Sequence, residues 1–300
     1  PRMSENLLNP TNDYVFKRLF AHDSALLIAL INDLRPDLPN ITGADVLNPA
    51  ITPEELSGKH IVLDVLARDA EGNHYNLEIQ VRRHDAWRQR GVFYLARTLS
   101  QHLASGEDYA EVRAVVGLHL LDFDLFTATE AEQNQAVWRF ELRDERQPAV
   151  SLGNVRQLNI IELKKADRLA ANPGPIAAWV TFFKHWREDT IMANLEHEPV
   201  HRAMNRLHEL SADEEARRLA FVRERALHDE TSLLNTARRE GEKIGIAKGR
   251  EEGFEEGAKV TQRNTAKRLI ATGLLSDQQI AASTELSLDE VAALYNRTDH

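Results

Sequence analysis

Two acidic side chains stand at mirrored positions of a predicted β-hairpin, where together they could bind a metal ion. Apolar and polar residues alternate over residues 63–68 and again over residues 74–81, the pattern of two half-buried strands. The residues between these segments have the composition of a turn. If the turn centres on Glu71, Asp64 lies directly opposite Glu78, and both side chains point away from the apolar face, toward solvent.

The chemistry of this pair follows from its spacing. Opposed Cβ atoms in an antiparallel pair are about 4.5–5.5 Å apart, so the two carboxylates repel each other unless a positive charge lies between them. A divalent metal ion is the simplest such charge. Gln80 and Arg82 follow Glu78 on the same face. Two acids, a polar donor and a cation are what a metal-dependent phosphodiesterase needs, although acidic pairs on the solvent side of hairpins are also common without any function.

Three segments of the chain resemble a known family. They read Asn-Pro-Thr-Asn-Asp-Tyr-Val-Phe-Lys-Arg-Leu-Phe over residues 9–20, Leu-Asp-Val over residues 63–65 and Glu-Ile-Gln over residues 78–80. They resemble the Rpn family, the recombination-promoting nucleases that are also named as transposases, within the PD-(D/E)XK nuclease superfamily. The resemblance implies a metal-dependent DNA endonuclease linked to recombination or mobile elements. It also implies a restriction-endonuclease-like α/β fold, in which helices flank a mixed sheet.

The resemblance further implies which residues bind the metal. Asp64 takes the place of the motif aspartate, and Glu78 takes the place of the motif glutamate. The backbone carbonyl of Ile79 is a candidate third ligand, and Asp13 is a further acidic candidate. Mg²⁺ is the expected cofactor, with Mn²⁺ or Ca²⁺ as alternatives.

Gln80 takes the place of a lysine that much of the superfamily carries. A glutamine is usual at this position in the Rpn family, but its amide cannot supply a positive charge. We expect Gln80 to orient the attacking water, and Lys17 or Arg82 to supply the charge. The glutamine also supports an alternative function: a catalytically weak or inactive DNA-binding or scaffold protein that oligomerises through its C-terminal helices.

Basic residues around the hairpin could bind DNA phosphates. Residues 82–97 contain five arginines and a single acid, Asp85. The whole chain has a formal net charge of −10, which argues against a protein that coats DNA. Local charge beside a metal site can still position a phosphate, and the alternative is a solvated helix face. The candidates for phosphate contacts are Lys17, Arg82, Arg83, Arg88 and Arg90.

Composition excludes several classes of protein. The 300 residues contain no cysteine, which rules out disulfides and thiolate zinc sites and fits a reducing cytoplasm. No apolar run approaches the ~18 residues of a membrane span, and the N-terminal segment lacks an apolar signal region. We therefore expect a cytoplasmic protein with no membrane partner.

Periodicity predicts the helices and strands that would position these residues. Residues 1–165 are expected to form the nuclease domain, because strands flanked by helices make an α/β fold with a mixed sheet. Its helices are predicted over residues 12–20, 24–34 and 86–104. Besides the hairpin, strands are predicted over residues 112–121, 136–142 and 155–163. The first of these is apolar enough to be buried on both faces.

After residue 165 the chain is predicted to be helical. Residues 166–237 form a helical extension in this prediction. Its aromatic residues Trp179, Phe182 and Phe183 recur at helical spacing. That spacing favours a place in a hydrophobic core over a platform for stacking bases.

The last part of the chain contains a small repeat and a predicted helical tail. Residues 238–260 carry a glycine at every fourth position from Gly241 onward. This spacing predicts either a flexible charged linker or a helix that a second helix can approach closely. Residues 261–300 are predicted to form a small helix-turn-helix-like unit with capping boxes at Ser276 and Ser287. The unit could bind DNA or protein, and the C-terminal helices could make the chain a homo-oligomer.

Overall fold

The computed structural model divides the chain into two compact units. The described residues are 7–57, 64–83, 87–100, 108, 112–153, 155–170 and 174–295. The first unit spans Pro1–His228 and the second spans Asp229–His300. Each unit has a hydrophobic core of its own.

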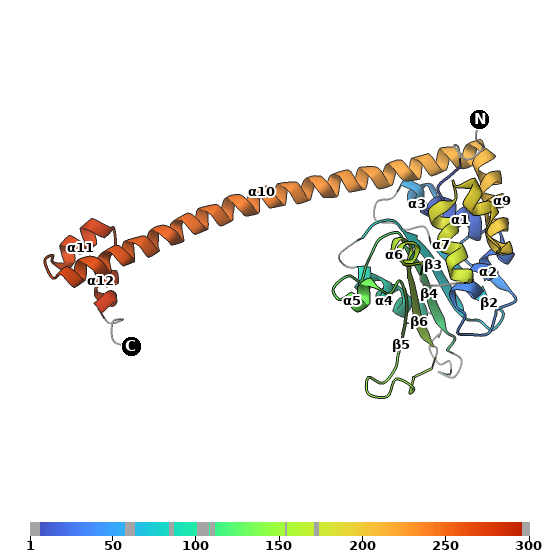
Figure 1. The fold of residues 1–300 in the computed structure, drawn as a ribbon, viewed down its shortest axis with the longest axis horizontal. Helices are drawn as coiled ribbons and strands as arrows, with labels where there is room; N and C mark the ends of the chain where they lie inside the picture. The colour runs from blue at the N-terminus through green and yellow to red at the C-terminus, as the bar shows by residue number, and fades with distance from the viewer. Residues whose placement is uncertain are drawn as a thin grey trace. The chain divides into compact units, whose positions relative to one another are not determined.

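The first unit is built on a six-stranded mixed sheet (Figure 1). The strands are β1 (Ala44–Val46), β2 (Val65–Asp69), β3 (His74–Gln80), β4 (Val115–Leu121), β5 (Val137–Glu141) and β6 (Arg156–Glu162). They lie in the order β1-β2-β3-β4-β6-β5, in which β3, β4 and β6 run parallel and the other neighbours are antiparallel. The predicted restriction-endonuclease-like α/β fold is confirmed. The sequence predicts every strand except β1, whose three residues are too few to show an alternating pattern.

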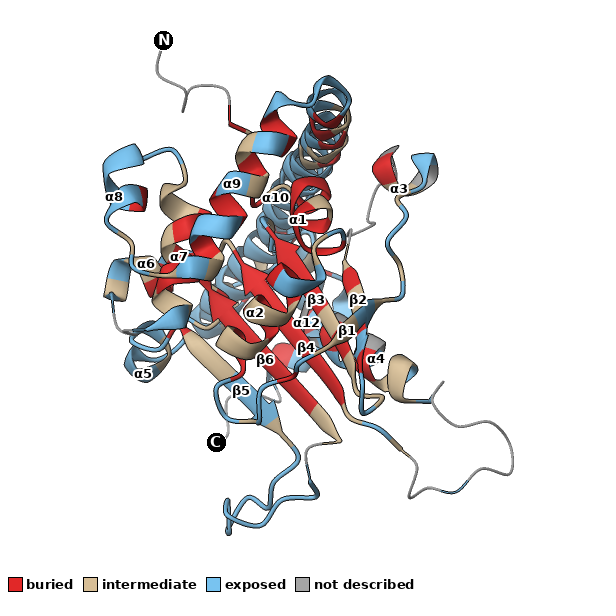
Figure 2. Cartoon of the chain, turned by 90° about the vertical axis from the view of Figure 1, so that its right-hand side faces the viewer, coloured by how far each residue is buried: buried red, intermediate tan, exposed pale blue. Residues whose placement is uncertain are grey.

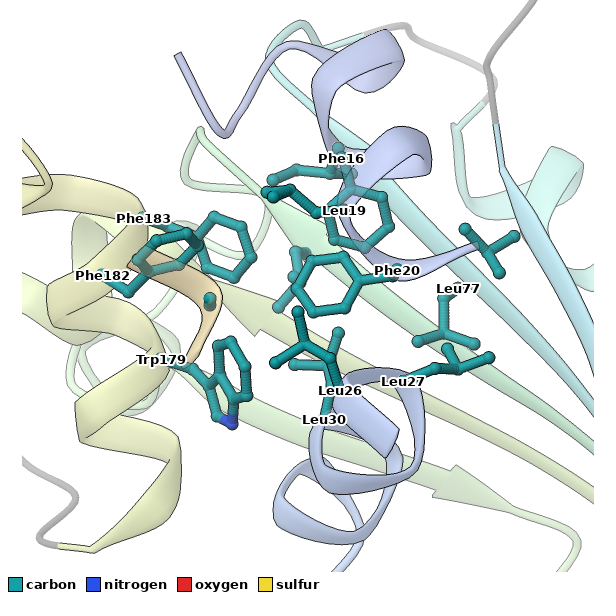
Figure 3. Packing of buried hydrophobic residues seen from close by; sticks show 14 of the residues in the cluster. Phe16, Leu19, Phe20, Leu26, Leu27, Leu30, Leu77, Trp179, Phe182 and Phe183 are labelled. Atoms are coloured by element: carbon teal, nitrogen blue, oxygen red, sulfur yellow. The ribbon is translucent and has the colours of Figure 1, made fainter. Parts of the chain in front are cut away.

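Helices pack against one face of the sheet and bury its apolar side chains (Figures 2 and 3). The main helices of this layer are α1 (Asp13–Phe20), α2 (Ser24–Leu34), α7 (Pro175–His185) and α9 (Glu198–Ala212). The ring centroids of Phe20 and Trp179 lie 5.7 Å apart, and Phe183 packs beside both (Figure 3). The aromatic residues of α7 are therefore part of the core, as their spacing predicts.

The hydrophobic core continues beyond residue 165. Two short helices that the sequence does not predict are α3 (Pro53–Ser57) and α5 (Glu130–Gln133). The predicted helical extension contains α8 (Asp189–Ala193) and most of α6 (Leu163–Leu169), which begins before residue 166. Residues of α6, α7 and α9 lie in the same buried cluster as α1 and α2. The helical extension thus completes the layer that covers the sheet.

The opposite face of the sheet is partly covered by α4 (Trp87–Ser100). Leu95 of this helix packs into a smaller cluster with Val115, Leu121 and Leu158. All seven residues of β4 are buried, so this strand is covered on both faces, as its apolar sequence predicts. The face beneath α4 is the one on which Glu78 lies.

The long helix α10 (Glu214–Thr272) contains the glycine-spaced segment, so this segment is helical. It is followed by α11 (Asp277–Thr284) and α12 (Leu288–Tyr295), whose N-termini carry the predicted capping boxes at Ser276 and Ser287. Both short helices share a small core with Ala266 of α10. Among the described residues, every helix is either too short or too polar to cross a membrane.

Candidate active site

The hairpin has the register that the sequence predicts. Val65 pairs with Leu77, and one step further in the same register Asp64 lies opposite Glu78. Val65 and Leu77 are buried in the core, so Asp64 and Glu78 project from the other face. The alternation over residues 74–81 places Val81 on the apolar face with Leu77 and Ile79, but Val81 follows the end of β3 and is 36% exposed.

Two asparagine side chains hold the carboxylate of Asp64. Asn48, in the segment after β1, donates from Nδ2 to Oδ1 of Asp64 at 3.1 Å. Asn76 of β3 donates to Oδ2 at 2.5 Å. Asn48 is itself fixed, because its Oδ1 accepts the backbone N–H of Leu66 at 2.7 Å. Sequence reasoning missed both asparagines, although Asn76 stands two residues before Glu78 and thus on the same face.

Asp64, Glu78 and Lys17 share one electrostatic environment. Burial raises the pKa of the Asp64 carboxyl above its usual range, the charge of Glu78 raises it further, and the charge of Lys17 lowers it. Lys17 lies on α1 and is only 1% exposed. The protein therefore brings two acids together around a partly buried position with one lysine nearby, an arrangement that attracts a cation.

Glu78 and Gln80 are buried, at 9% and 6% exposure, although the alternating pattern suggests a solvent-facing position. Helix α4 packs on this face of the sheet, where its Gly91 lies beside His119, the neighbour of Glu78 on β4, and periodicity alone does not place a helix there. Nε2 of Gln80 donates to Oε1 of Glu78. Within the described part of the chain, Oε1 of Gln80 is buried and accepts no hydrogen bond. An acceptor left open in this way suits an ordered water.

His119 is a further residue of this site that sequence reasoning missed. It lies on β4 directly beside Glu78, and its Nε2 is 3.8 Å from Oε2 of Glu78. The feature of the sequence that could have identified it is that His119 is the single polar side chain within the apolar run Val-Val-Gly-Leu-His-Leu-Leu.

Asp13 lies in a different environment from the Asp64–Glu78 pair. Arg223 of α10, which is fully buried, donates from Nε to Oδ1 of Asp13 at 2.9 Å and from Nη2 to Oδ2 at 2.7 Å. This bidentate ion pair joins α1 to α10 across 210 positions of sequence. Because both oxygens of Asp13 are bound to Arg223, we leave Asp13 out of the ligand set.

The candidate phosphate contacts differ in exposure. Arg83 is exposed and Arg82 is partly buried. Lys17 is buried, which suits an effect on Asp64 better than contact with a DNA backbone. Arg88 and Arg90 belong to α4, but their side chains lie outside the described residues.

The donor atoms at the site fit a hard divalent cation. No group of three or more His, Cys, Asp or Glu side chains in the described ranges could hold a metal ion. Mg²⁺ does not need such a cage, since it usually keeps several waters and binds through one or two carboxylates. Asp64 and Glu78 supply two carboxylates, and the open Oε1 of Gln80 could accept a hydrogen bond from a bound water.

Comparison with known proteins gives one match. A family model described as "PD-(D/E)XK nuclease family transposase" matches residues 10–237. The matched range includes the hairpin, the whole sheet, α1 and the first turns of α10. Searches of curated proteins and of solved structures find no match.

Proposed function

The chain belongs to the PD-(D/E)XK nuclease family of transposases, and from this membership we propose that it is a metal-dependent DNA endonuclease. It would hydrolyse phosphodiester bonds in the course of DNA recombination or the movement of mobile elements. The observation that carries this proposal is the pair of carboxylates, Asp64 and Glu78, opposed on one hairpin beside the buried Lys17.

Asp64 and Glu78 would hold the metal, with the backbone carbonyl of Ile79 as third ligand. Mg²⁺ is the proposed ion, and Mn²⁺ or Ca²⁺ could replace it at the same oxygen ligands. When bound, the metal would polarise the phosphate and lower the pKa of a bound water. Asn48 and Asn76 would keep the Asp64 carboxylate in place by their hydrogen bonds.

Other side chains of the chain would act on the water and the phosphate. Gln80 would orient the attacking water through its open Oε1. Lys17 would supply the positive charge that a glutamine cannot. Arg82 and Arg83 would bind the flanking DNA backbone, and Arg88 and Arg90 remain candidates for the same role.

The direct test is incubation of the purified protein with supercoiled plasmid and Mg²⁺. We expect conversion to the nicked or linear form, which EDTA prevents and added Mg²⁺ restores. Cleavage that persists in EDTA would contradict a metal-dependent mechanism. If the protein does not cleave with Mg²⁺, Mn²⁺ or Ca²⁺, that result would favour the scaffold alternative.

The role of Gln80 can be tested with two substitutions. Gln80→Leu should lower the nicking rate about fivefold, because a lost hydrogen bond to the water is worth about 1 kcal/mol. Gln80→Lys should keep or raise the rate, because it introduces the charge that much of the superfamily carries at this position. Gln133→Leu, at an exposed position of α5, is a matched control that should leave the rate unchanged. A wild-type rate in Gln80→Leu would remove Gln80 from the mechanism.

A second candidate function is a scaffold that oligomerises through the C-terminal helices. One observation favours self-association: apolar side chains of the glycine-spaced segment are exposed, with Ile244, Ile246 and Phe254 at 69%, 72% and 80%. A glycine weakens a helix by about 1 kcal/mol relative to alanine, and no neighbour lies within 4 Å of a Cβ built at Gly241 or Gly257. A helix of this composition gains stability from a partner.

Removal of the tail should separate the two functions. A chain that ends near Arg238 should keep the metal site, because Lys17, Asp64, Glu78 and Gln80 all precede the cut. It should lose self-association, DNA affinity or both, because the exposed segment and terminal helices are gone. Sedimentation and DNA-binding assays of both lengths measure this. Equal mass and equal affinity would make the tail a passive appendage.

A further inference from the structure

His119 is the one polar side chain of β4. It is 3% exposed, and its neighbours along the strand, Leu118 and Leu120, are buried in the main core. A buried imidazole needs a polar partner, because desolvation without one costs free energy. In the parallel register of β3 and β4, His119 is the direct partner of Glu78, and Nε2 is 3.8 Å from Oε2.

Two glycines leave room for this ring. A Cβ built on Gly117 would stand 3.2 Å from Nε2 of His119 and 2.8 Å from Cδ1 of Leu158, so a larger residue there would displace the ring or the leucine. A Cβ built on Gly91 of α4 would lie 3.7 Å from Cε1 of the ring. The imidazole is therefore held between the strand and the covering helix, with its Nε2 edge close to Glu78.

We propose that His119 is a positioning residue for Glu78. In the tautomer with hydrogen on Nε2, the ring donates a hydrogen bond to Oε2 of Glu78 after a small closure of the 3.8 Å gap. Gln80 already donates to the other oxygen, Oε1. Glu78 is then held from two sides. The inference rests on the proposed metal site, since holding a carboxylate raises metal affinity only if the carboxylate is a ligand.

Two substitutions of His119 test this role, because they are expected to have different effects on Mn²⁺ affinity. His119→Leu fills the same apolar space but has no donor. It should bind Mn²⁺ about tenfold or more weakly, the usual cost of losing a residue that orients a metal ligand. Cooperative thermal unfolding of the metal-free variant should show that the fold is kept. His119→Gln can place an amide donor near the position of Nε2 and should keep most of the affinity.

The measurement is Mn²⁺ binding to the full-length protein, followed by calorimetry or by loss of the free Mn²⁺ signal in electron paramagnetic resonance. Leu121→Val is the matched control, because Leu121 is buried on the same face of β4, two residues from His119. It should leave the affinity unchanged. Weaker binding in His119→Leu, together with near wild-type binding in His119→Gln and Leu121→Val, supports the inference.

Other outcomes contradict distinct parts of the argument. If the wild type binds Mn²⁺ and His119→Leu binds it equally well, His119 does not position Glu78, and the proposed nuclease function still stands. If His119→Gln and Leu121→Val lose as much affinity as His119→Leu, the residue serves packing alone. A wild type that binds no Mn²⁺ would overturn the metal site and the inference together.

Discussion

Replacement of Asp64 with asparagine is expected to lower Mg²⁺-dependent plasmid nicking at least about a hundredfold. The substitution keeps the size of the side chain but removes one of the two proposed carboxylate ligands. A catalytic metal is worth several kcal/mol of transition-state stabilisation, and each 1.36 kcal/mol is a factor of ten in rate. Glu78→Gln should have an effect of similar size. Initial nicking rates at saturating Mg²⁺ measure both.

The same substitution should stabilise the metal-free protein at neutral pH. Burial and the charge of Glu78 raise the pKa of Asp64 in the folded chain. The ionised carboxyl therefore costs stability above its unfolded pKa, and this cost vanishes in acid, where the group is protonated in both states. The thermal midpoint of Asp64→Asn should thus exceed that of the wild type at neutral pH, and the difference should disappear as the pH falls. The new amide can still accept from Asn48, and the Asn76 amide can turn over to accept from it.

The control is Asp45→Asn, which makes the same chemical change at an exposed position of β1. It should leave both the nicking rate and the thermal midpoint close to wild-type values. Nicking at the wild-type rate by Asp64→Asn would show that Asp64 is not a ligand. Loss of nicking together with a lower midpoint at neutral pH would point to damaged folding instead of a lost metal site.

Lys17→Met should lower the nicking rate about a hundredfold, the cost seen when one preorganised charge or donor is removed from a transition-state site. The lysine is buried on α1, and its charge lowers the pKa of Asp64. Its removal should therefore raise that pKa further. The acidic limb of the pH–rate profile should move to higher pH, a change that a purely structural role for Lys17 would not produce.

Lys164→Met is the matched control for this experiment, because the Lys164 side chain is 53% exposed. It should leave the rate and the pH profile unchanged. Lys17→Arg keeps the positive charge and should recover part of the lost activity. If Lys17→Met retains the wild-type rate and profile, the missing charge comes from another residue, and Arg82 is the next candidate to substitute.

Local patterns in the sequence determined much of this fold. The alternation in the hairpin predicted the register that places Asp64 opposite Glu78, because side chains alternate faces with a period of two and the turn sets the pairing. The continuous apolar run predicted the fully buried β4. The capping boxes at Ser276 and Ser287 predicted where two terminal helices begin. Each of these features depends on residues that are neighbours in sequence.

The tertiary structure alone decided which distant groups surround the acidic side chains. Asn48 binds Asp64 from another segment, and His119 meets Glu78 through a parallel strand pair. Arg223 pairs with Asp13 from 210 residues away, which takes Asp13 out of the site. Parallel strand pairs and packed helices bring together segments that are distant in sequence, so the periodicity of one segment cannot predict which residues of another it will contact. The placement of α4 on the face of the sheet that carries Glu78 has the same origin. Sequence spacing sets which way a side chain points, and the packing of remote elements sets what it meets there.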